Sequence, residues 1–192
     1  MISLNACDLF SQNTSSAGSS CRAGKGATGN PKTIEEVVEL VNSLPKPLSI
    51  PCFLESLNRP LEIFATNSRS SVQPAVGEIP RVFIFKGPLV ISVAPEGPGQ
   101  SLVEVSHLIS DYESVKGELA FPVNEELSKS AAYEGVLSGS GTRCSACHFS
   151  EHNASDSFPS VAYASQALRP SFTSEVSIDS LRSLAEACNS RR

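Results

Sequence analysis

The feature that most restricts the fold of this 192-residue chain is a series of short apolar runs separated by Gly- and Pro-rich turns. The runs cover residues 61–66, 81–86, 89–94, 102–106 and 115–123. Apolar runs of this length are typical of strands, and short turns between them join antiparallel neighbours. We therefore expect an antiparallel meander of four to five strands. The run 81–86 is apolar on both faces, which predicts a central position.

A helix is expected at each end of this meander. Thr33 and Glu36 form a capping-box pattern, and apolar residues follow at helical spacing over 34–44. Ser177 can cap a C-terminal helix, whose apolar positions include Cys188. The expected fold class is thus α+β and rich in strand. A long irregular segment, 135–172, is expected between the sheet and the last helix.

That irregular segment contains the sequence Cys144-Ser-Ala-Cys147-His148. Two thiols at this spacing can each add to one vinyl group of a porphyrin, and the imidazole that follows can ligate the iron. We predict that Cys144 and Cys147 carry covalent haem c and that His148 is the proximal ligand. A CxxC pair can also be a redox dithiol, a local disulfide or part of a zinc site, to which His152 could contribute.

The five-residue motif resembles that of c-type cytochromes, and its place near the C-terminus is similar to that in an uncharacterised family of bacterial lipoproteins. This resemblance covers only the motif and the exported character of the chain. It implies a monohaem protein that transfers single electrons to an unknown redox partner outside the cytoplasm. The common small cytochrome c is instead helical, carries its motif near the N-terminus and supplies a distal methionine. Here Met1 is the only methionine.

His107, at the end of an expected strand, is therefore the remaining candidate for a distal iron ligand. An iron without a distal ligand would bind a small gas or peroxide, which makes a peroxidase-like enzyme a further alternative. Asp111, Glu113 and Glu118 are expected to be exposed charges with no catalytic role. We expect an electron carrier rather than a catalyst.

The N-terminal sequence Leu4-Asn-Ala-Cys7 resembles the end of a bacterial lipoprotein signal, in which the cysteine is acylated. Residues 1–30 then form a lipobox remnant and a flexible Ser- and Gly-rich tether, followed by a single globular domain over 31–192. This interpretation predicts a start codon upstream of Met1. It also predicts a protein exported to the periplasm or the outer face of the cell envelope and held to the membrane by lipids on Cys7.

Cysteine usage agrees with an oxidising compartment. Cys21 and Cys52 flank the first expected helix and are expected to form a disulfide, with Cys188 either unpaired or replacing Cys21. A net charge of −5, without a Lys/Arg cluster, argues against nucleic acid as a partner. The competing function is a non-enzymatic lipoprotein module for binding or structure, whose Cys144–Cys147 pair is a disulfide or a metal contact.

Overall fold

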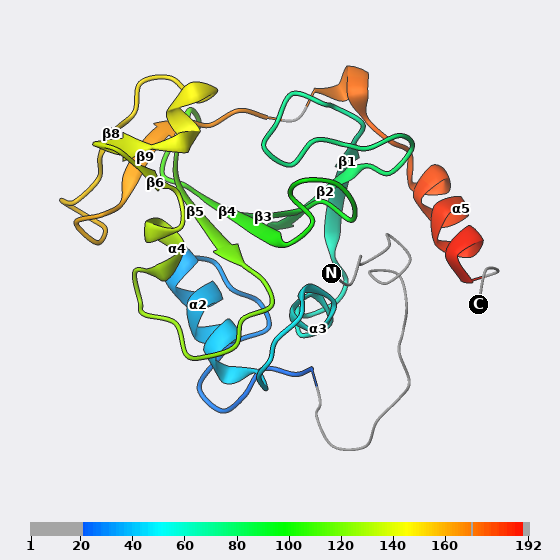
Figure 1. The fold of residues 1–192 in the computed structure, drawn as a ribbon, viewed down its shortest axis with the longest axis horizontal. Coiled ribbons are helices and arrows are strands. Elements are labelled where there is room, and N and C mark those ends of the chain that lie inside the picture. Colours follow the sequence, from blue (N-terminus) through cyan, green and yellow to red (C-terminus); the bar gives the residue numbers. More distant parts are fainter. Residues whose placement is uncertain (1–20, 170, 190–192) are drawn as a thin grey trace.

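The five apolar runs form five of the seven strands of one antiparallel sheet in an α+β fold, shown in Figure 1. The computed structural model describes residues 21–169 and 171–189. The strand order is β1-β2-β3-β4-β5-β9-β8. The strands are β1 (Glu62–Thr66), β2 (Arg81–Lys86), β3 (Leu89–Val93), β4 (Leu102–Leu108), β5 (Glu113–Ala120), β8 (His152–Asn153) and β9 (Tyr163–Gln166).

One face of the sheet holds the apolar core. Val103 and Val105 of β4 pair with Leu119 and Gly117 of β5, and the side chains of Val103, Val105 and Leu119 belong to the same core cluster as those of the helices on this side. Figure 1 shows those helices together. They are α2 (Ile34–Ser43), α3 (Ile50–Glu55) and α4 (Ala131–Glu134). Because side chains alternate along a strand, the residues between the core positions project from the other face.

This other face is polar over β4 and β5. Glu104 lies directly opposite Glu118, and Ser106 lies opposite Lys116. Arg81 of β2 donates a hydrogen bond to Glu104 at 2.5 Å from the same face. Both Lys116 and Glu118 are buried, so a further layer of chain must cover them. Arg143, directly before the Cys144–His148 segment, lies 3.4 Å from the Glu118 carboxylate, and the end of β9 accepts hydrogen bonds from Lys116.

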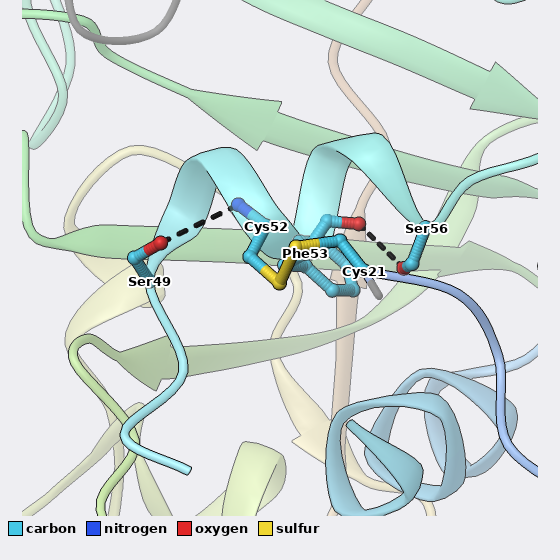
Figure 2. Close-up of a disulfide and its surroundings, with 5 residues drawn as sticks. All are labelled: Cys21, Ser49, Cys52, Phe53 and Ser56. Carbon is cyan, nitrogen blue, oxygen red and sulfur yellow. Dashed lines mark hydrogen bonds between the residues drawn. A yellow bond between two sulfur atoms is a disulfide. The ribbon is translucent and has the colours of Figure 1, made fainter. Parts of the chain in front are cut away.

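The helix starts follow from local hydrogen bonding. The Thr33 hydroxyl accepts from the Glu36 amide at 3.2 Å, as the capping pattern predicts, and the Glu36 carboxylate bonds back to the amide of Lys32. Ser49 caps the start of helix α3, and its hydroxyl accepts from the Cys52 amide at 3.4 Å (Figure 2). Pro51 in the first turn suits a helix start, because the amide it lacks has no partner there.

A disulfide links Cys52 of α3 to Cys21, with Cα atoms 5.1 Å apart (Figure 2). This is the first of the two pairings considered from the sequence. Cys7 lies outside the described residues. Cys188 lies in helix α5 (Ile178–Asn189), and its side chain is also outside the described part of the chain.

The structure extends the expected meander in two places. Segment 135–172 is not irregular throughout, because β9 pairs with β5 and β8 pairs with β9. The same segment contains β6 (Leu137–Ser138), β7 (Gly141–Thr142) and the 3₁₀ helix η1 (Arg143–Ala146); η2 (Phe172–Ser174) follows it. The C-terminal helix α5 is present, but Ile178 on its apolar side is 53% exposed. Over the described residues, no helix combines the length and apolarity required to cross a membrane.

Candidate functional site

The Cys144–His148 motif begins in η1, which Thr142 caps. The Thr142 hydroxyl accepts from the Cys144 amide at 3.1 Å, and the Ser145 hydroxyl donates to the Thr142 carbonyl at 2.9 Å. The amides of Cys147 and His148 then both donate to the Cys144 carbonyl, at 3.1 and 2.8 Å. These short-range bonds fold the five residues into one tight turn. The motif therefore has a defined backbone conformation and is not an open loop.

The His148 ring is oriented by a backbone carbonyl of β9. Its Nδ1 lies 2.8 Å from the carbonyl oxygen of Gln166. Because a carbonyl oxygen can only accept, Nδ1 must carry the proton in this hydrogen bond, and Nε2 then keeps its lone pair. Burial lowers the pKa of His148, and this favours the neutral ring. Histidines that ligate metals in proteins are commonly oriented in the same way, with the second ring N–H donated to a carbonyl.

Two anchors fix the motif to the rest of the fold. Arg143 donates to the carbonyl of Gly135 at 2.6 Å and lies 3.4 Å from the buried carboxylate of Glu118 on β5. The Glu151 carboxylate accepts from both the amide and the hydroxyl of Thr142, which closes the segment into a ring of chain around the motif. Glu118 was expected to be exposed. It is buried, because this segment folds over it.

Lys116 lies beneath the motif and was not singled out from the sequence. It is 8% exposed, and its ammonium donates to Ser114, to the Ser165 carbonyl and to the Gln166 carbonyl, at distances between 2.8 and 3.4 Å. Burial lowers its pKa to about 8, against the opposing effects of Cys144 and Glu151. The signal that could have found it is the alternation of Ser114, Lys116 and Glu118 with core residues along β5. That alternation predicts a polar inner face.

The two cysteines of the motif differ in their surroundings. Cys147 is exposed and Cys144 is half-buried, and both are free thiols. Burial raises the pKa of the Cys144 thiol, which the Thr142 hydrogen bond and Lys116 oppose. Among the described residues, no three His, Cys, Asp or Glu side chains are grouped to hold a metal ion. The structure thus assembles no tetrahedral zinc site around the motif.

The structure does not bring the other two histidines to His148. His107 lies on the core face of the sheet, between Leu89 and Val115 in register, and its ring packs edge-on against Phe158 at 5.8 Å. Lys116 and the motif lie on the opposite face. His152 is exposed on β8, 4.0 Å from Glu113. The geometry therefore gives no support to a distal role for His107.

Comparisons with protein-family models, with curated proteins and with solved structures found no match to this chain. The geometry of the motif and of the residues that hold it is therefore the basis for any functional assignment.

Proposed function

We propose that the protein is an exported monohaem electron carrier, with haem c attached at Cys144 and Cys147 and His148 as the proximal ligand. The observation that carries the proposal is the 2.8 Å contact between Nδ1 of His148 and the carbonyl of Gln166. It sets the tautomer that leaves Nε2 for iron, and it does so through a β-strand of the main sheet.

The donor set also fits the group. Haem c requires two thiols two residues apart and an imidazole next to the second thiol. Cys144 and Cys147 are both free thiols within one 3₁₀ turn, and the amides of Cys147 and His148 share one acceptor. When bound, the haem supplies a one-electron couple whose potential depends on axial ligation and burial. The chain contributes the orientation of His148.

The exposure of the motif suits electron transfer to another protein. Cys147 is exposed and His148 is only half-buried, so a group attached there has an edge near the surface. Small redox proteins exchange electrons through brief encounters over limited contact areas. The proposed partner is accordingly a second redox protein that meets this edge of the sheet.

The compartment follows from the same chemistry. The Cys21–Cys52 disulfide is typical of proteins in an oxidising environment, where haem c is also attached. We place the protein in the periplasm or at the outer face of the envelope, with acylated Cys7 as its membrane anchor. Incorporation of labelled palmitate that is lost in Cys7→Ser tests the anchor separately from the haem.

The decisive experiment is expression of the chain behind an export signal in bacteria that carry the cytochrome c maturation machinery. We expect a red protein whose absorbance stays with the polypeptide after acid–acetone extraction. Cys144→Ser combined with Cys147→Ser should abolish the bound haem, and His148→Ala should reduce it strongly. His152→Ala is the matched control, because this exposed histidine lies four residues further on and should leave the haem content unchanged. A colourless wild-type protein would exclude the proposed function.

A further inference from the structure

Four large apolar side chains are exposed on the surface beside the motif, and we call this group the Tyr112 surface. Ile109 and Tyr112 belong to the turn between β4 and β5, Phe149 to the chain that leaves the motif, and Leu168 to the chain that leaves β9. They are 42%, 78%, 68% and 53% exposed, in that order. Single exposed apolar residues are common, but a group of them marks a place where a protein binds something.

Backbone hydrogen bonds hold this surface around the end of β9. The amide of Gln166 donates to the carbonyl of Phe149 at 2.9 Å, and the amide of Ala167 donates to the carbonyl of Tyr112 at 2.7 Å. The amide of Ile109 donates across the β4–β5 turn at 3.0 Å. The Tyr112 surface is therefore built on the hydrogen-bonded edge of the sheet.

The surface mixes aromatic and polar groups. A groove of about 610 Å³ runs between Tyr112 and Phe149, and Ser110, Ser150 and the acid Glu113 line it together with the two rings. Interfaces between proteins combine aromatic side chains with polar groups in the same way. This composition therefore fits a protein partner.

The charges around the surface are mainly negative. Asp111 and Glu113 are the charged residues of the turn 109–114, and Arg169, next to Leu168, is the cation closest to them along β9. His152 lies 4.0 Å from Glu113 and adds a positive charge only when it is protonated. The whole chain carries a net charge of −5. A partner that presents positive charge around an apolar contact is complementary to this surface.

The Tyr112 surface is directly connected to His148. Phe149 follows His148 through one peptide bond, and Nδ1 of His148 is hydrogen-bonded to the carbonyl of Gln166 at 2.8 Å. The surface therefore lies on the Nδ1 side of the ring, and Nε2 is directed away from it. One hydrogen bond and one peptide bond separate the proposed proximal ligand from residues of this surface.

We propose that the redox partner docks on the Tyr112 surface, and that it presents an apolar contact surrounded by lysines or arginines. This inference rests on the proposed function and adds the place and the charge of the partner. His148 and its hydrogen bond to Gln166 give a short path for one electron from the proposed haem to the oxidised partner. The partner is reduced by that electron, and no covalent bond forms or breaks.

The test measures electron transfer from the reduced, haem-loaded protein to mitochondrial cytochrome c, a small basic redox protein that serves as the probe. Tyr112→Ser combined with Phe149→Ser should lower the second-order rate constant roughly tenfold, because loss of aromatic anchors weakens an interface by about this factor or more. Phe172→Ser is the matched control, since Phe172 is 83% exposed but packs against Phe64 of β1, at the other end of the sheet. Its rate constant should equal that of the parent.

A second pair of variants tests the charge of the partner. Asp111→Asn combined with Glu113→Gln should lower the same rate constant at low ionic strength, and the difference from the parent should shrink as salt is added. Asp179→Asn combined with Glu186→Gln removes the same charge from exposed positions of α5 and is the control. It should change the rate constant much less.

Two further quantities are measured in every variant: the haem content per polypeptide, and the rate with hexaammineruthenium(III), a small oxidant that needs no protein surface. If both stay unchanged while transfer to cytochrome c slows, the docking assignment is supported. Equal rates with cytochrome c in the parent and in the Tyr112→Ser, Phe149→Ser protein, or an equal loss with the ruthenium complex, would overturn it and leave the proposed function intact. A dimer in sedimentation that the same double variant dissociates would assign the surface to a second copy and also overturn it. A wild-type chain that binds no haem would overturn both proposals.

Discussion

The burial of the Lys116 ammonium leads to a prediction about stability that can be tested without haem. Lys116 is 8% exposed, and its pKa is lowered from 10.5 to about 8, mainly by burial. The folded protein therefore binds the Lys116 proton more weakly than the unfolded chain does. Lys116→Met should remove the free-energy cost of burying this ammonium. It also removes the donor that now hydrogen-bonds to the carbonyls of Ser165 and Gln166.

The sign of the pH effect follows from proton counting. Between pH 8 and 10.5 the unfolded state keeps the lysine proton and the folded state loses it, so the free energy of unfolding rises with pH. Integration over pH 7 to 10 with these two pKa values gives an increase of roughly 2–3 kcal/mol from this one group. Below pH 7 the contribution is constant. The raised pKa of Tyr133 acts with the opposite sign at still higher pH, which sets the upper end of the useful window.

The assay is urea unfolding of the haem-free protein at several values of pH from 7 to 10. Cys144→Ser and Cys147→Ser serve as the background, because they remove the two free thiols of the motif, which could attack the disulfide in alkali. The free energy of unfolding is plotted against pH, and its slope in the parent protein is compared with its slope in Lys116→Met. Lys129→Met, at an exposed position, is the control for loss of charge. Equal slopes in the parent and in Lys116→Met would refute the burial argument.

Three further perturbations test the disulfide, the contact between Gly135 and β5, and the hydrogen bonds of Glu151 to the motif turn. Replacement of Cys21 and Cys52 by Ser opens a loop of 31 residues and should lower the free energy of unfolding by about 3–4 kcal/mol in denaturant titrations, a loss that the chain-entropy model predicts. Gly135→Ala would place a Cβ 2.2 Å from a β5 carbonyl oxygen, so we expect a loss of about 1–3 kcal/mol by the same measurement. Glu151→Gln weakens the two bonds to Thr142, and faster amide hydrogen exchange confined to the motif turn should report it.

The meander and the two outer helices could be predicted because local signals agree with the tertiary structure there. Apolar runs such as 81–86 are bounded by turns, and Thr33 caps the helix that follows it. Strands β8 and β9 could not be predicted in this way. Strand β9 is only Tyr163–Gln166, and its buried residues are Ala164 and Ser165, which carry no apolar alternation. Their pairing is decided by β5, distant in the sequence.

The site itself could be predicted only in part. The spacing of Cys144, Cys147 and His148 is local and can be read directly from the sequence. The support of His148 is not local, because its acceptor is the carbonyl of Gln166, 18 residues further on. The burial of Lys116 and Glu118 is also a tertiary effect, since the motif segment has to cross the edge of β5 to cover them.

The polar face beneath the motif explains why a surface turn can hold a histidine in one orientation. The Gln166 carbonyl accepts from both the His148 ring and the Lys116 ammonium, at 2.8 and 3.2 Å. A buried ammonium costs free energy unless it is hydrogen-bonded, and its bonds to β9 therefore fix the position of this strand end against β5. The same strand end orients the imidazole and lies between Tyr112 and Phe149. The buried lysine thus connects the stability of the sheet edge to the geometry of the proposed haem site, and a change at Lys116 should alter both.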